Sequence, residues 1–148
     1  MNNRLARFIA TGAGLGRLPM PGTMASAAPF LFWFFIATRL TSTPEVLLYL
    51  VLIIIVLWAT VLYSRNQQYR DLPEIVGDEI LACLLIIGSL PPVWYHYLSA
   101  FIIFRLLDIF KPFGIRKIEK IPGVWGIILD DLAAAAVTII IVSFLPIL

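Results

Sequence analysis

The stretch VLLYLVLIIIVLWATVLY, residues 46–63, decides the fold class of this chain. Its 18 residues include no charged side chain. About 20 consecutive apolar residues, wound as a helix, are enough to span the hydrocarbon core of a bilayer. We therefore predict a transmembrane helix here.

The composition of the whole chain agrees with that prediction. Of its 148 residues, 61% are hydrophobic and only 14% are charged, and the mean hydropathy is +0.96. A soluble domain is about half apolar and about a quarter charged. These values exclude a disordered chain, a nucleic-acid-binding module and a typical cytosolic enzyme. We expect one membrane-embedded domain over residues 1–148.

Four further apolar runs follow or precede the decisive stretch. They are residues 24–38, 75–90, 93–110 and 124–148. The first has about 15 residues, which is short for a full crossing, so we expect it to be tilted or partly inserted. The fold class is thus an all-α integral membrane protein, a bundle of about four to five transmembrane or partly inserted helices.

Basic residues are distributed very unevenly over the loops. If each apolar run crosses the bilayer, residues 1–23, 64–74 and 111–123 share one side. That side carries nine basic residues and the other side only Arg39; the nine are Arg4, Arg7, Arg17, Arg65, Arg70, Lys111, Arg116, Lys117 and Lys120. Cytoplasmic loops are enriched in Lys and Arg. We expect a multi-pass protein of the bacterial cytoplasmic (inner) membrane, with its N-terminus in the cytoplasm.

Five acidic residues fall at one depth in this topology, near the cytoplasmic ends of three helices. They are Asp78, Glu79, Asp108, Asp130 and Asp131. Each charge costs about 2.5–3.5 kcal/mol at a helix centre, and less near the interface. Two kinds of compensation are open: ion pairs with Arg105 and Lys111, or a hard cation such as Mg²⁺, which suits carboxylate and phosphate oxygens.

A structural explanation of these acids competes with a functional one. Acids at the start of a helix are stabilised by the helix dipole, and both adjacent pairs fit that explanation. Asp108 does not, because it lies near a helix C-terminus, where Arg105 is its expected partner. Adjacent helical residues point about 100° apart, so we expect one member of each pair to face the site. Convergence of three such features favours a site at the cytoplasmic face.

The basic, glycine- and proline-rich lead, residues 1–23, has two interpretations. Its GxGxG pattern lacks the strand and the glycine spacing of a dinucleotide fingerprint. Backbone N–H groups of glycines and of a helix start bind anions well, so Gly22, Thr23 and Arg17 are candidates for binding a phosphate. The alternative is a flexible loop with Thr23 as the helix N-cap.

Together these residues suggest phosphoryl chemistry on a lipid headgroup. Arg105 and Lys111 would hold the phosphate, and Mg²⁺ would neutralise the acids and polarise the phosphoryl oxygens. One carboxylate would serve as general base or as nucleophile. The acyl chains would stay in the lipid bilayer, and nothing indicates a nucleic acid partner.

Four stretches carry a resemblance to a known family. They are GAGLGRLPMPGTMAS (12–26), EIVGDE (74–79), FRLLDIFKPFGI (104–115) and GIILDD (126–131). In this order they resemble the phosphatidylglycerophosphatase A family of bacterial membrane enzymes. The departures, Ala25, Ala82 and Gly114, remove no charged group. The resemblance implies a Mg²⁺-dependent phosphatase that converts phosphatidylglycerophosphate to phosphatidylglycerol in phospholipid biosynthesis, with the five acids as its catalytic and metal-binding set.

Other functional classes remain open from the residues alone. A small cation or proton transporter is one, because intramembrane acids often mark ion pathways, although residues 46–63 carry none. Another lipid-headgroup phosphotransfer enzyme is a second, although the DGxxAR pattern of the CDP-alcohol transferases is absent. A structural assembly subunit with ion-paired helix ends is a third. Cys83 and His96 are the only residues of their types, which excludes an intrachain disulfide and multi-His metal sites.

Overall fold

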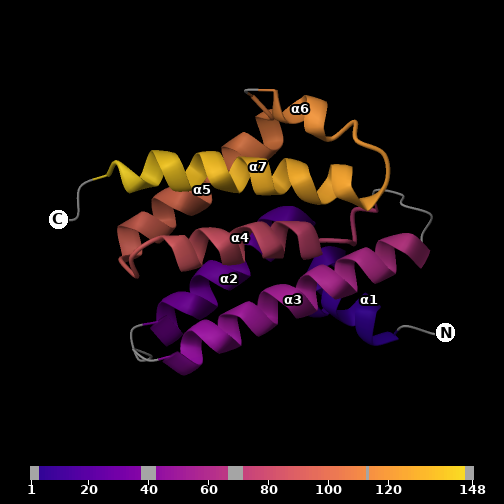
Figure 1. The fold of residues 1–148 in the computed structure, drawn as a ribbon, viewed down its shortest axis with the longest axis horizontal. Helices are drawn as coiled ribbons and strands as arrows, with labels where there is room; N and C mark the ends of the chain where they lie inside the picture. The colour runs from indigo at the N-terminus through magenta and orange to yellow at the C-terminus, as the bar shows by residue number, and fades with distance from the viewer. Residues whose placement is uncertain (1–3, 38–42, 67–71, 113, 146–148) are drawn as a thin grey trace.

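The computed structural model describes residues 4–37, 43–66, 72–112 and 114–145, and every regular element in these ranges is helical (Figure 1). The predicted all-α fold is confirmed for this part of the chain. Five helices are long: α2 (Pro21–Ala37), α3 (Thr43–Asn66), α4 (Gly77–Ser89), α5 (Trp94–Phe110) and α7 (Val124–Ser143). They correspond to the five apolar runs. Arg39 and Arg70, which entered the charge comparison, lie outside the described residues.

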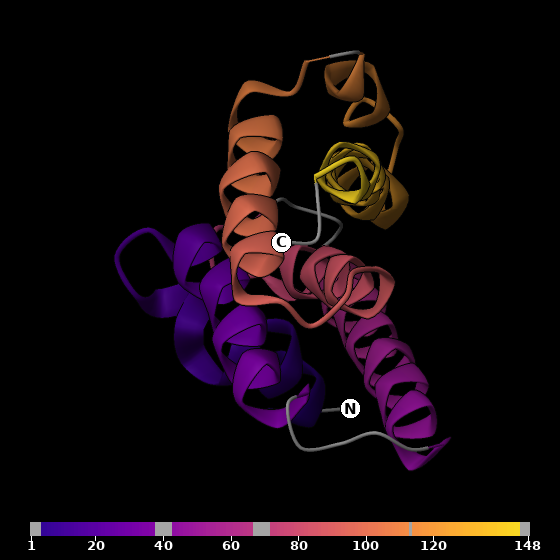
Figure 2. The ribbon, with the colours of Figure 1, turned by 90° about the vertical axis from the view of Figure 1, so that its left-hand side faces the viewer.

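Helix α4 is the central helix of the bundle. It contacts α2, α3, α5 and α7, and Figure 2 shows these helices around it. Its buried side chains include Ala82, Cys83, Ile86 and Ile87, which pack in one core cluster with Phe104 of α5. Cys83 is thus a packed apolar thiol.

The lead before α2 is helical, so the expectation of a loop is wrong. It consists of α1 (Arg4–Ala10) and the 3-10 helix η1 (Gly12–Arg17). Ala6 and Ala10 are fully buried and belong to the same core cluster as Ala59 and Tyr63 of α3. At the start of η1 the chain turns through positive φ angles at Gly12, Ala13 and Gly14, a conformation that the two glycines adopt without strain. Thr23 lies inside the first turn of α2, so it is not the N-cap.

The lengths of the helices limit how each can cross a bilayer. Two segments are long and apolar enough to span one by length and composition, Val46–Arg65 and Val124–Ser143. Helices α2 and α5 have 17 residues each and α4 has 13. The α4 axis is therefore about 20 Å long, shorter than the hydrocarbon core of about 30 Å. A straight crossing by α4 alone would thus fall short of the hydrocarbon core, in keeping with a bundle of transmembrane and partly inserted helices.

Polar helix ends meet at one end of the bundle. The first turns of α2 and α4 adjoin the last turn of α5 and the N-terminal half of α7. In Figure 1 α1 and the start of α7 lie at this end, on the right, whereas α7 ends on the left. The short helix α6 (Ile115–Ile118) connects α5 to α7 here. Because successive long helices alternate in direction, residues as far apart in the sequence as Pro21 and Asp131 meet at this end.

Candidate active site

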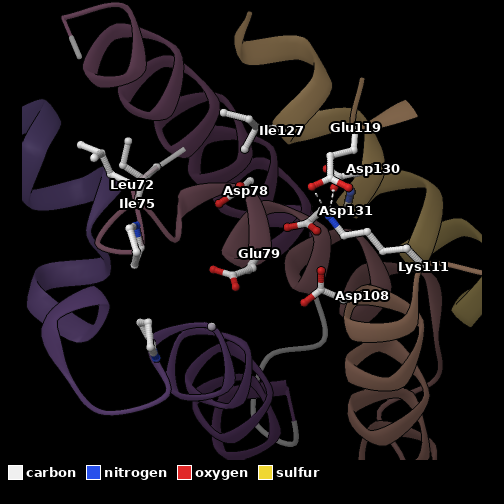
Figure 3. A pocket seen from close by; sticks show the side chains of 13 residues that line it. Leu72, Ile75, Asp78, Glu79, Asp108, Lys111, Glu119, Ile127, Asp130 and Asp131 are labelled. Atoms are coloured by element: carbon white, nitrogen blue, oxygen red, sulfur yellow. Dashed lines mark hydrogen bonds and ion pairs between the residues drawn. The ribbon is translucent and has the colours of Figure 1, made fainter. Parts of the chain in front are cut away.

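A pocket of about 180 Å³ opens where these helix ends meet (Figure 3). Its carboxylate lining comprises Asp78, Glu79, Asp108, Glu119, Asp130 and Asp131. Lys111, Pro21 and Gly22 line it as well, with apolar side chains on one side. All five acids predicted from the sequence therefore converge on one space, and Figure 3 shows the carboxylates of Asp78, Glu79, Asp108 and Asp131 turned toward it.

Both members of each acidic pair line the pocket, so the expectation that only one would face the site is wrong. Asp78 and Glu79 lie in the first turn of α4, as predicted. The pocket lies at the end of that helix, where neighbouring side chains both reach it. Asp130 and Asp131 reach it because α7 packs against α4 and α5 at once, so the pocket borders a wide arc of α7.

Asp130 and Asp131 do not begin α7, which corrects a second expectation. The helix begins at Val124, so they follow six and seven residues later, about 9–10 Å along the axis. Gly126 permits the early start, because a Cβ there would overlap the Ile121 carbonyl oxygen. The dipole effect falls off within the first turn, so it does not account for these two acids.

Arg105 links two of the acids. Its guanidinium donates a hydrogen bond to Asp108, three residues later, and Nη1 lies 3.6 Å from Oε1 of Glu79. The predicted Arg105–Asp108 pair is thus confirmed, and it explains an acid near a helix C-terminus. Gly22 of α2 lies directly against this group: an added Cβ would overlap Oε1 of Glu79 and lie 3.1 Å from both terminal nitrogens of Arg105.

Lys111 links two further acids, Asp130 and Glu119. It occupies the left-handed cap of α5 at φ 46°, and its Nζ lies 2.6 Å from Oδ2 of Asp130 and 3.3 Å from Oε1 of Glu119. Burial alone would lower the pKa of Lys111, but the hydrogen bond and charge of Asp130 outweigh burial and raise that pKa above its ordinary value. The ammonium group is therefore charged at neutral pH.

Glu119 is the site residue that sequence reasoning missed. It lies in the basic segment 111–123, which we took as a cytoplasmic loop. The sequence did single it out, because Glu119 is the one acid in a segment that carries four basic residues, and an ion pair with one of them could have been predicted.

Two of the predicted phosphate-binding residues are not part of the pocket. Gly22 and Lys111 line it and Arg105 adjoins it, but Thr23 and Arg17 do not line it. Arg17 instead lies 3.8 Å from Glu74 and lines a different pocket, with Arg4 and Arg7.

Comparison with known proteins identifies the family of this chain. The family model described as Phosphatidylglycerophosphatase A matches residues 8–146. The chain belongs to the phosphatidylglycerophosphatase A family. This confirms the resemblance seen in its motifs, and the matched residues include every acid of the pocket.

Three relatives match this chain over most of its length. It is 32% identical over 144 residues to Phosphatidylglycerophosphatase A of Escherichia coli (strain K12), which covers 93% of this chain and 81% of the relative. It is 29% identical over 138 residues to the protein of that name from Haemophilus influenzae, covering 91% and 85%. It is 28% identical over 143 residues to a Putative phosphatidylinositol-3-phosphatase of Bacteroides thetaiotaomicron, covering 92% and 90%. No solved structure matches the chain significantly.

The donor chemistry of this phosphatidylglycerophosphatase A family site suits a hard divalent cation. As the side chains stand, no three Asp, Glu, His or Cys residues among those described are close enough to hold a metal ion. Coordination would require some carboxylates to draw together. Six carboxylates nevertheless surround one space that also holds Lys111, and Oδ1 of Asp78 is buried without a hydrogen-bond partner in the described structure. An all-oxygen set with excess negative charge fits Mg²⁺.

Proposed function

We propose that this protein is a Mg²⁺-dependent phosphatase that hydrolyses phosphatidylglycerophosphate to phosphatidylglycerol and phosphate. The observation that carries the proposal is the convergence of six carboxylates with Lys111 and Arg105 at one pocket. Family membership supplies the substrate, since two relatives are named for this activity. The residues of the pocket and the family membership thus both support a phosphatase of phospholipid biosynthesis.

The ion pairs divide the carboxylates into two groups. Arg105 holds Glu79 and Asp108, and Lys111 holds Glu119 and Asp130. Within the described part of the chain, no ion pair engages the remaining two, Asp78 and Asp131. These two are 8% and 5% exposed, and a buried carboxylate needs a compensating charge. We therefore assign them as the first ligands of Mg²⁺, with the paired acids beside them.

The two cations are placed to bind the phosphate. Lys111 lines the pocket, and the Nε of Arg105 is buried without a hydrogen-bond partner among the described residues. Charge-assisted hydrogen bonds from such groups to phosphate oxygens are short and strong. Mg²⁺, when bound, would offset the negative charge of the acids and of the phosphate.

The reaction needs one proton acceptor. The oxygen of a water molecule forms a bond to phosphorus while a carboxylate takes its proton, and the P–O bond to the glycerol breaks. The departing lipid alkoxide is then protonated to the alcohol. In the second route, a carboxylate oxygen forms the bond to phosphorus as the P–O bond to the glycerol breaks and the lipid alkoxide takes up a proton; water then cleaves the acyl phosphate, which releases phosphate and restores the carboxylate. Both routes use the same set of acids.

The proposed placement has the pocket at the cytoplasmic surface of the inner membrane. Helices α3 and α7 supply the two segments long enough to span it. Basic residues of the lead and of α6 lie at the pocket end of the bundle, as expected of cytoplasmic segments. The headgroup of a lipid substrate would then meet the carboxylates while its acyl chains remain in the bilayer.

The decisive experiment measures phosphate release from phosphatidylglycerophosphate by detergent-purified protein, with Mg²⁺ and then with EDTA. We expect Asp108→Asn to lower the rate at least about 100-fold, because the change removes a charge at the reaction centre. Lys120→Gln, at an exposed residue outside the pocket, should keep the wild-type rate. Gel filtration and thermal melting verify that each variant is folded.

Three results would contradict parts of the proposal. Full activity of folded Asp108→Asn would remove the site assignment. Activity that EDTA leaves unchanged would remove the metal. Release from phosphatidylinositol 3-phosphate alone, the lipid in the name of the Bacteroides thetaiotaomicron relative, would keep a lipid phosphatase but replace its substrate.

A further inference from the structure

A second pocket lies on the lead, apart from the candidate active site. Its volume is about 320 Å³, and α1 and η1 form it. Arg4, Arg7 and Arg17 line it, with Phe8, Thr11 and the turn at Ala13–Gly14. Among the described residues no acidic side chain lines this pocket, so its charge is opposite to that of the carboxylate pocket.

The positive charge of this pocket is only partly balanced. Glu74 lies 3.4 Å from Nη2 of Arg7 and 3.8 Å from Nε of Arg17. Both arginine side chains are about half exposed, so these pairs leave guanidinium N–H groups open to a further acceptor. Arg4 makes no ion pair in the part of the chain that the structure describes. One carboxylate therefore pairs with two of the three guanidinium groups that line the pocket.

Exposed apolar side chains occur on the same lead, and one of them, Phe8, lines the pocket. Leu5 is 63% exposed, Phe8 58% and Met20 69%. The opposite side of α1 is buried, since Ala6 and Ala10 pack against α3. A short helix with arginines and large apolar groups on its free side is typical of a segment lying in a membrane interface. A soluble anion would need the arginines but would gain nothing from the apolar groups.

We propose that the pocket on the lead binds the headgroup of an anionic phospholipid, separate from any substrate in the carboxylate pocket. Its phosphodiester oxygens accept hydrogen bonds from the arginines, whose planar N–H groups match phosphate geometry. Its acyl chains lie along Phe8 and Leu5. This inference stands independently of the phosphatase activity, because it uses none of the six acids.

The test counts bound lipids by native mass spectrometry of the full-length protein in a neutral detergent. Phosphatidylserine, phosphatidylcholine and inorganic phosphate are titrated in separate arms. Phosphatidylserine is neither a phosphomonoester nor the product of the proposed reaction. We expect one phosphatidylserine to bind in preference to phosphatidylcholine. Arg4→Gln, which disturbs no pair with Glu74, should weaken that binding about fivefold, and raised salt should weaken it further.

The matched control is the double variant Arg116→Gln/Lys117→Gln, which neutralises two exposed basic residues of α6 outside the pocket. It should bind phosphatidylserine like the wild type. Equal losses in the control and in Arg4→Gln would show diffuse charge attraction and overturn the site. Equal binding of the two lipids would overturn it too, and displacement of phosphatidylserine by equimolar inorganic phosphate would reassign the pocket to a free anion.

Discussion

Gly22 is the residue through which α2 approaches the candidate active site. A Cβ at this position would overlap Oε1 of Glu79 and crowd both terminal nitrogens of Arg105. The overlapped atoms are the ends of flexible side chains, so they can move aside while the backbone stays in place. The substitution should therefore disturb the arrangement of charges more than the fold.

We predict that Gly22→Ala lowers kcat/KM about 10- to 100-fold, since displacements near 1 Å at a reaction centre have effects of this size. The melting temperature should change little. Initial rates of phosphate release measure the effect. Met24→Ala, at an exposed position of the same helix, is the control and should behave like the wild type. Unchanged rates in Gly22→Ala would mean that Glu79 and Arg105 need no fixed position.

Single residues show how far the sequence alone could go at the site. The Arg105–Asp108 pair was predictable because residues three apart are neighbours on a helix. The Lys111–Asp130 pair spans 19 residues and joins α5 to α7, so only the packing of those helices reveals it. Glu119 joins the site for the same reason. The five other acids were found because acids are conspicuous in apolar runs, whatever their tertiary partners.

At the scale of elements, the lead is held in place by the segment before α4. The backbone N–H of Val76 donates to the Ala10 carbonyl at 3.0 Å. Tyr63 donates to Glu74 at 2.6 Å. That bond, together with Arg7 and Arg17, lowers the pKa of Glu74 despite partial burial. Gly16 packs so closely that an added Cβ would overlap the Glu74 carbonyl oxygen and lie 2.7 Å from its carbon.

We predict that Gly16→Ala destabilises the protein by about 1–3 kcal/mol, because overpacking against backbone atoms forces a shift of both segments. Thermal melting in detergent measures it, and a fall of several degrees is expected. Ala13→Gly is the paired variant. Ala13 has φ 57°, which glycine adopts more easily, so that change should be neutral or stabilising. Wild-type melting of Gly16→Ala would show that the lead is not docked on Glu74.

Element boundaries divide into those that sequence fixes locally and those that packing fixes. The starts of α5 and α7 were predicted to within one residue, because Pro91–Pro92 and Pro122–Gly123 interrupt the apolar pattern there. The helical lead was missed, because an isolated segment as short as the seven-residue α1 prefers the unfolded state, and the glycines after it disfavour helix. Burial of Ala6 and Ala10 against α3 overrides that preference. The helix propensities of the lead alone could not predict this contact with α3.

At the scale of the whole molecule, the two ends of the bundle differ in chemistry. The pocket end carries the acids, the lead and α6, whereas the connection at 90–93 lies at the far end of α4, with Pro92 exposed. The charge pattern predicts that the pocket end faces the cytoplasm. The five apolar runs predicted helices that alternate in direction, and the long helices of the structure do so. Helix α4 keeps this alternation although it has only 13 residues.

Cysteine accessibility checks this orientation. We predict that a membrane-impermeant maleimide labels Pro92→Cys in intact spheroplasts but labels Lys120→Cys only after the membrane is opened. The native Cys83 is fully buried, so it contributes little background. Detergent-lysed cells, in which both sites should react, serve as the control. Labelling of Lys120→Cys from outside would reverse the proposed topology.

The late position of α7 in the chain has a consequence for biosynthesis. A ribosome delivers α2, α4 and α5 to the membrane first, with Arg105, Lys111 and three of the acids in place. Asp130 and Asp131 arrive with α7, the last helix. A nascent or truncated chain that stops before residue 130 thus lacks one of the two acids that pair with Lys111 and one of the two carboxylates without an ion pair in the described structure. On the proposed function, such a chain left in the membrane would be inactive.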